Sequence, residues 1–283
     1  MTEAAEQHAT AHQAHNTHEN GTIGGLQHGV PEFGAVTLGV LAEALRRGWH
    51  DFMRAPVFGV IFASVYVLLG IFMVWLTRWS GHSYWLVFAA AGFPLIGPFT
   101  AVGLYEVSRR LERQETLSMK GIFGVILLQS QRQLPSISAI IIFMFLFWFF
   151  LAHMIFAVFM GTVTMTNVSA SFEVYLTSNG LSMLAVGSVV GAGFALLLFM
   201  ITVVSLPMLL DREVDYVSAM IASFQLVQEN FVPMILWAGF VAVLTFVAML
   251  PAFMGLFIVL PLLGHATWHL YDLLLQTAEV SDE

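Results

Sequence analysis

The chain of 283 residues contains no cysteine. Disulfides, thiolate metal sites and cysteine nucleophiles are therefore excluded. Because a cysteine-free chain is compatible with any redox environment, thiol usage does not indicate a compartment.

Charge is also scarce, since only 10% of the residues are charged and 58% are hydrophobic, with 25 Phe, 15 Met and 7 Trp. A soluble domain is closer to about a quarter charged. The composition therefore predicts a polytopic membrane protein, with the lipid bilayer as its first partner. The net charge of −8, without a basic face, predicts that nucleic acid is not a partner.

Motifs that mark common chemistries are missing as well. The sequence has no phosphate-binding GxxxxGK[ST] loop, no HExxH zinc motif and no nucleophile elbow. It also lacks an uncompensated charge in the middle of an apolar run, which ion-coupled pumps and transporters usually need. We therefore expect no catalytic residues, no cofactor and no enzymatic activity.

Long uncharged runs predict the membrane spans. A helix needs about 20 apolar residues to cross a bilayer. Two runs match one span each, and three are longer: 57–77, 84–105, 133–172, 174–210 and 230–271. The last run is twice the required length and holds Pro251 near its middle, so we divide it into two spans and expect six in all.

A weak internal repeat supports this division. Three times the chain shows an amphipathic segment, a proline, a long span, and a second span with a proline near its end, at Pro94 or Pro98, Pro207 and Pro261. The predicted fold is all-α, with six transmembrane helices arranged as three helical hairpins, each preceded by a cytoplasmic amphipathic helix. In the first such helix, Leu38, Leu41, Leu45 and Phe52 form the apolar face. Proline should bend or loosen the second span of each hairpin.

The domain boundaries and the orientation follow from the polar residues. Residues 1–33 form a polar, His-containing tail expected to be disordered, residues 34–275 form the six-helix domain, and residues 276–283 form an acidic tail. With six spans, nine of the ten Lys and Arg lie on one side of the membrane and only Arg78 on the other. The positive-inside rule then places both termini in the cytoplasm.

Four motifs carry a family resemblance. They are "GWHDF" (48–52), "GPFTAVGLYEVSRR" (97–110), "SLPMLLDREV" (205–214) and "LPLLGHATWHLY" (260–271). In this order they resemble the domain-of-unknown-function family 2189 of predicted bacterial integral membrane proteins, from about Glu43 to Leu275. The resemblance implies a protein of the bacterial inner membrane and implies no reaction.

Histidines are the main candidates for a metal or haem site. His265 and His269 are four residues apart and share a helical face. This spacing suits a metal or haem site or proton handling, but it also suits residues that pack at the membrane surface, which we favour. We expect at least one of them to make a hydrogen bond to another helix, either to a main-chain carbonyl or to an acid such as Glu106 or Asp211. His153 lies within a span and is a further candidate ligand. The tail histidines, His8, His12, His15 and His18, are spaced for weak metal binding at most.

Counting from the repeated prolines brings several polar residues to the same membrane surface. The predicted cytoplasmic polar cluster consists of Glu106, Arg109, Asp211, Arg212, His265 and His269. Such groups at helix ends are typical of a structural ion-pair network, although a functional role stays open. Gly187, Gly191 and Ala195 form a stripe of small residues suited to close helix packing, either within the chain or in a homodimer.

Three function classes remain. The favoured interpretation is a scaffold or accessory subunit that binds other membrane proteins or forms a homo-oligomer. The alternatives are a channel or carrier for a small neutral or amphipathic solute, and a metal- or haem-handling membrane protein. A scaffold predicts apolar outer faces and a filled centre, whereas a carrier predicts a polar-lined cavity near the proline sites.

Overall fold

The computed structural model describes residues 22–23, 26–81, 85–161 and 172–281. The fold is all-helical, as predicted, and five helices are long and apolar enough to cross a membrane. Three short strands are added at one end. The histidines of the tail, His8 to His18, lie outside the described residues.

The first group of helices comprises α2 (Leu38–Arg54), α3 (Pro56–Ser80) and α4 (Trp85–Glu112). Thr37 caps the start of α2, because its hydroxyl accepts a hydrogen bond from the backbone amide of Val40. Pro56 ends the helical run and starts the next helix at its first position, where a missing amide costs nothing. Gly81 closes α3 with a left-handed φ of 68°.

The second group comprises α5 (Met119–Gln129), α6 (Leu134–Met160), a short 3-10 helix (Phe172–Leu176), α8 (Ser178–Thr202) and α9 (Ser205–Asp211). The helical ladder is interrupted between α8 and α9, just before Pro207. Proline removes a backbone donor and crowds the preceding turn, which explains the break. In contrast, α4 continues through Pro94 and Pro98.

The third group comprises α10 (Tyr216–Glu229), α11 (Phe231–Met249) and α12 (Leu256–Ser281). The long uncharged run is divided near Pro251, as predicted, by a turn in which Ala252 and Phe253 have positive φ. The last helix begins at Leu256, four residues later than Ala252, and runs without a break through Pro261. It also continues beyond residue 275, into the segment predicted as an acidic tail.

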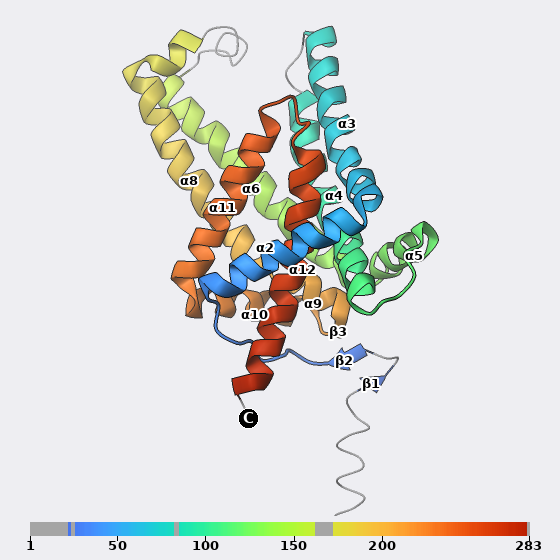
Figure 1. Cartoon of the computed structure of the whole chain (residues 1–283). Coiled ribbons are helices and arrows are strands. Elements are labelled where there is room, and N and C mark those ends of the chain that lie inside the picture. Colours follow the sequence, from blue (N-terminus) through green and yellow to red (C-terminus); the bar gives the residue numbers. More distant parts are fainter. Residues whose placement is uncertain (1–21, 24–25, 82–84, 162–171, 282–283) are drawn as a thin grey trace, which may run out of the picture.

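Helix α2 lies across α12 and packs against it (Figure 1). Its buried residues are Leu41, Ala44, Gly48, Asp51 and Phe52. Of the apolar face predicted from the sequence, Leu41 and Phe52 are buried in the fold, whereas Leu38 is 64% exposed. A Cβ at Gly48 would lie 2.6 Å from the Ala266 amide nitrogen, so glycine at this position permits the close crossing of the two backbones.

The segment before α2 runs over the same end of the bundle. β1 (Thr22–Ile23) pairs with β2 (Leu26–His28), and β2 pairs in parallel with β3 (Arg212–Glu213). The Gly34 amide donates to the Leu274 carbonyl at 2.9 Å, and the Val36 amide donates to the Asn230 side chain at 2.9 Å. The described end of the predicted tail is thus paired with β3, and the residues that follow it are bonded to α12 and to Asn230.

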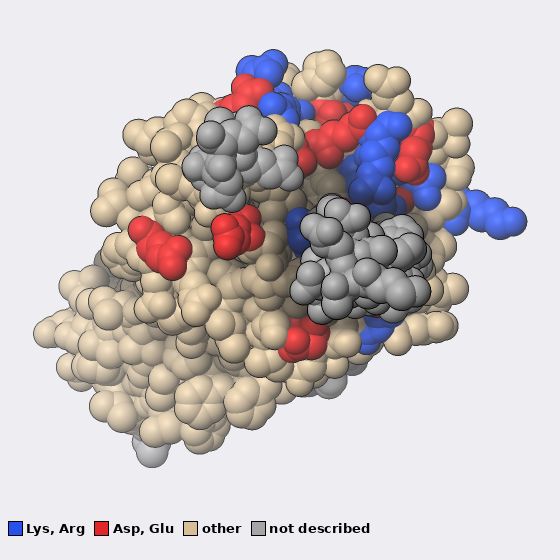
Figure 2. All heavy atoms as spheres, turned by 90° about the horizontal axis from the view of Figure 1, so that it is seen from below, with Lys and Arg blue, Asp and Glu red and all other residues tan. Residues whose placement is uncertain are grey.

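Charged side chains gather at this end of the molecule (Figure 2). We call it the charged end, defined by α2, α9, α10 and the last turns of α4 and α12. The largest buried core also lies here, with residues from α4, α9, α10 and α12. The opposite end consists of apolar helices that diverge (Figure 1).

Candidate functional site

The charged end brings together polar side chains that are distant in the sequence. His269 lies on α12 between two carboxylates. Its Nε2 donates to Asp51 Oδ2 on α2 at 2.7 Å, and its Nδ1 lies 3.0 Å from Glu112 Oε1 on α4, off the line of a hydrogen bond. This one imidazole therefore joins three helices.

Asp51 is 4% exposed, although it belongs to a helix that the sequence placed at the membrane surface. Burial opposes ionisation of this carboxyl, but the hydrogen bond and the charge of His269 outweigh burial and leave the pKa of Asp51 below its usual value. The pair is therefore best described as a buried ion pair between α2 and α12.

His265 lies one turn earlier on α12 and is fully buried. A hydrogen bond joins its Nδ1 to Ser108 Oγ at 2.8 Å, and its Nε2 has no hydrogen-bond partner among the described residues. A serine paired with a histidine resembles half of a nucleophilic site. Both side chains are completely enclosed, however, so the pair offers no surface to a substrate.

Glu106 and Asp211, the acids expected near the histidines, are bonded elsewhere. Glu106 is fully buried and accepts hydrogen bonds from Arg109 at 2.7 Å and from Arg110 at 2.6 Å. The Tyr271 hydroxyl donates a hydrogen bond to Asp211 Oδ2 at 3.1 Å, and Asp211 Oδ1 lies 3.6 Å from Arg113 Nη2. The two acids given as examples are therefore not the partners of the histidines, but the expected bond to another helix is present, from His269 to Asp51 and between His265 and Ser108.

Arg212 completes the predicted polar cluster, at the boundary of α9 and β3. Its Nε is buried and makes no hydrogen bond to any part of the chain that the structure describes. Of the six predicted residues, only Glu106 and Arg109 bond each other directly. Asp211, His265 and His269 contact residues that the sequence interpretation missed, namely Asp51, Ser108, Glu112, Arg113 and Tyr271.

One of the missed residues left a signal in the sequence. The spacing of Leu41, Ala44, Gly48 and Asp51 is three, four and three, which is one stripe along a helix. Two small residues on that stripe indicate close helix contact. A carboxylate continuing the same stripe then predicts a buried polar partner, which is His269.

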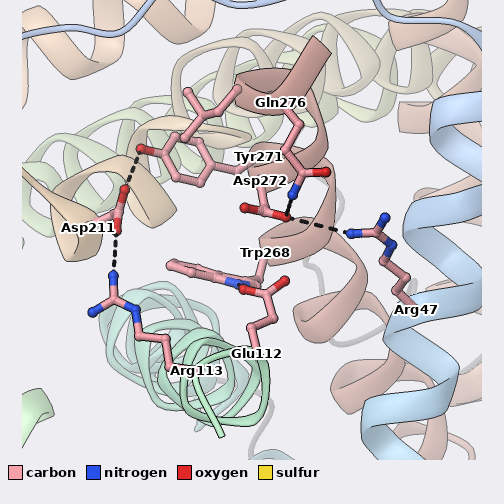
Figure 3. A pocket seen from close by; sticks show the side chains of 9 residues that line it. Arg47, Glu112, Arg113, Asp211, Trp268, Tyr271, Asp272 and Gln276 are labelled. Atoms are coloured by element: carbon pink, nitrogen blue, oxygen red, sulfur yellow. Dashed lines mark hydrogen bonds and ion pairs between the residues drawn. The ribbon is translucent and has the colours of Figure 1, made fainter. Parts of the chain in front are cut away.

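A pocket of about 380 Å³ opens beside this network (Figure 3). On its wall the Trp268 indole donates to Glu112 Oε2 at 2.8 Å. Arg47 Nη1 lies 3.7 Å from Asp272 Oδ2, which also accepts from Gln276. Both signs of charge line the pocket and are already paired, so it favours no ion of one sign.

A second pocket of about 230 Å³ lies among α3, α4, α11 and α12, and we call it the hydroxyl pocket. It adjoins the proline sites at Pro98 and Pro261 in sequence. Its wall carries five hydroxyl groups and no charged side chain. The lining residues are Tyr66, Gly97, Thr100, Ala101, Leu104, Tyr105, Val241, Thr245, Leu260, Leu263, Gly264 and Thr267.

The remaining candidate ligand, His153, bonds within its own helix. Its Nδ1 donates to the Phe149 carbonyl at 2.8 Å, and its ring packs on that of Phe149. Within the described ranges, no group of three or more His, Asp or Glu is arranged to hold a metal ion.

The small-residue stripe of α8 is only partly used inside the chain. Gly191 faces the Trp148 indole of α6, where a Cβ would lie 3.2 Å from its nitrogen. A Cβ at Gly187 would have no described atom within 4 Å, and Ala195 is exposed. Of the predicted stripe, only Gly191 therefore makes a close contact with another helix, at Trp148 of α6.

Comparison with known proteins gives a family match. No curated protein and no solved structure matches the chain. Two of the four motifs, at 97–110 and 205–214, fall wholly or largely in the segment matched by a family model, whereas "GWHDF" and "LPLLGHATWHLY" lie outside it. Residues 85–211 match the model of the family described as predicted integral membrane protein (DUF2189), so the resemblance is confirmed from α4 to α9.

Proposed function

We propose that the chain is a six-span protein of the bacterial inner membrane with both termini in the cytoplasm. The five apolar helices provide five spans, and α4 provides the sixth. With 28 residues, α4 is about 42 Å long at the helical rise, more than a bilayer core requires. The basic residues support the orientation, because they lie near α2, α5, α9 and the end of α4, whereas Arg78 is in the last turn of α3.

We further propose that the protein acts without catalysis, as a scaffold or accessory subunit for other membrane proteins. One observation carries this proposal. None of the most apolar 18 residues of α6 is buried, whereas the corresponding share is 61% in α12. Helix association in a bilayer depends on van der Waals packing between helix faces. Helix α6 therefore has the most surface left for a partner.

The charged end suits the same role. Buried ion pairs join α2, α4 and α12, so the cytoplasmic half of the bundle is tied together by Asp51, Glu112 and His269. In contrast, α6 and α8 diverge from the other helices at the far end (Figure 1). A rigid base with one projecting helix pair is an arrangement that can present α6 to another protein.

The topology can be tested directly, because the chain has no cysteine of its own. Lys120→Cys and Arg78→Cys place single thiols at the two ends of the bundle. A membrane-impermeant maleimide added to spheroplasts should label the Arg78→Cys variant and should label Lys120→Cys only after lysis. The reverse pattern would invert the orientation, and labelling of both in intact cells would exclude six spans.

The scaffold role can be tested by photo-crosslinking in cells. A benzophenone amino acid at Phe143, which is 70% exposed on α6, should give discrete adducts with another protein. The same substitution at Phe72, which is 47% exposed on α3, is the control and should give lipid adducts. Adducts with lipid alone at Phe143 would refute the proposal, and adducts of two copies of this chain would assign α6 to self-association instead.

A further inference from the structure

The hydroxyl pocket contains a polar group that the fold does not use. Tyr105 lines this pocket and is 5% exposed. No hydrogen bond joins its hydroxyl to a described residue, and this oxygen is not among the fully enclosed unpartnered atoms, so it is open to the pocket; its ring packs beside Trp268 at a centroid distance of 6.5 Å. A buried phenol usually finds a partner, because leaving it unpaired costs free energy. The free hydroxyl therefore points to a partner from outside the chain.

The other hydroxyls of the pocket differ in how they are satisfied. Thr267 Oγ1 donates to the Leu263 carbonyl of its own helix at 2.8 Å, and the Tyr66 hydroxyl lies 3.4 Å from the Phe93 carbonyl, a long contact. Thr100 is buried on the same wall. Of these hydroxyls, Thr267 is already bonded, whereas Tyr66 makes only a long contact and Tyr105 none among the described residues; all of them are neutral.

Charge and size restrict the ligand. Because no charged residue lines the pocket, an ionic headgroup would lose its hydration without compensation. The volume of about 230 Å³ is below the ~300 Å³ at which pockets for drug-sized ligands begin. The space therefore suits a small polar group with the first part of a hydrocarbon chain, which would contact Val241, Leu260 and Leu263.

We propose that the hydroxyl pocket binds a neutral amphiphile, whose hydroxyl or carbonyl oxygen accepts a hydrogen bond from Tyr105. Such a ligand has two sources, a neutral membrane lipid or a small alcohol-like solute. The proposal is independent of the scaffold role, since it concerns α3, α4, α11 and α12 rather than the exposed face of α6.

Photolabelling tests the binding. The full chain in phosphatidylcholine nanodiscs is exposed to an eight-carbon alcohol carrying a diazirine, and labelled peptides are mapped by mass spectrometry. We expect labelling in α4 and α12 that unlabelled 1-octanol displaces. Tyr105→Phe should raise the half-saturating concentration about 2- to 10-fold, the effect of one neutral hydrogen bond. Tyr216→Phe, on α10 outside the pocket, is the matched control and should leave it unchanged.

Two further arms separate recognition from simple partitioning. Thr245→Leu, which fills the pocket with an apolar side chain, should abolish displaceable labelling. An eight-carbon alkane diazirine without the hydroxyl should show no dependence on Tyr105. Labelling that 1-octanol does not displace, or equal labelling of folded wild type and Tyr105→Phe, would overturn the proposal, with size-exclusion profiles establishing that each variant is folded.

Solvent extraction of the purified protein identifies the source. A neutral lipid that co-purifies with the wild type and is lost in Thr245→Leu would assign the ligand to the bilayer. Displaceable binding of the octanol probe without a co-purifying lipid would assign it to a soluble solute. Failure of partner crosslinking at Phe143 would leave both outcomes unaffected, so the two proposals fail separately.

Discussion

Removal of the Asp51 carboxylate should destabilise the protein by detaching α2 from α12. In the structure His269 Nε2 donates to Asp51 at 2.7 Å and both side chains are almost fully buried. Breaking a buried ion pair by deleting one partner costs about 3–5 kcal/mol. Glu112 lies 3.0 Å from the other ring nitrogen and still compensates part of the imidazole charge. We therefore expect Asp51→Ala to cost about 2–4 kcal/mol.

A double-mutant cycle measures this pair in the full chain. The free energy of unfolding is obtained by SDS titration in mixed micelles, for Asp51→Ala, His269→Ala and the double variant. The coupling energy should be about 1–3 kcal/mol, because the two residues are in direct contact. Asp215→Ala is the matched control, since this exposed carboxylate caps α10 and should combine additively with His269→Ala. Additive effects of Asp51→Ala and His269→Ala would refute the assignment of this contact as a stabilising ion pair.

The same pair predicts a pH dependence. The pKa of Asp51 is lower in the folded state than in the unfolded state, so the folded state favours the ionised carboxylate. Its contribution to stability is therefore present above the unfolded value of about 3.9 and is lost as the pH falls through the lower folded value. Stability of the wild type should decline below about pH 4 more steeply than that of Asp51→Asn. Identical declines would contradict the lowered pKa.

Three further predictions concern close contacts at the charged end. Gly48→Ala should lower the free energy of unfolding in SDS titration by about 1–3 kcal/mol, because its Cβ would overlap the backbone of α12. Gly39→Ala is the control, since its Cβ would meet only the Thr37 cap of its own helix, and it should change stability by less than about 1 kcal/mol. Equal effects of the two substitutions would argue against the close crossing of α2 and α12. Trp268→Phe should cost about 1–3 kcal/mol by the same titration, since Glu112 loses the indole donor, and a neutral result would show that water replaces it. Gly34→Ala should release the segment before α2, because its Cβ would overlap the Thr277 side chain of α12. Limited proteolysis should then be faster in this segment with unchanged cleavage elsewhere, and an unchanged rate would count against the contact.

Much of the helical framework was predictable because its signals are local. Pro56 and Pro251 lie where helical runs end, and proline favours such a boundary because it lacks an amide donor. Low charge and long apolar runs predict spans because a bilayer core cannot solvate polar backbone or side chains. The break before Pro207 follows from the same cause, whereas α12 continues through Pro261, which the local sequence does not explain.

The tertiary structure decided which polar groups meet. The sequence alone placed His269 at the membrane surface and suggested Glu106 or Asp211 as its partner. The actual partner, Asp51, is 218 residues away, and Glu106 is taken by two arginines of its own helix. Local periodicity cannot rank partners over such separations, because the choice depends on how closely the helix backbones approach. That approach is set by Gly48 against Ala266, where the absence of a side chain brings α2 near enough to α12 for an aspartate to reach the imidazole.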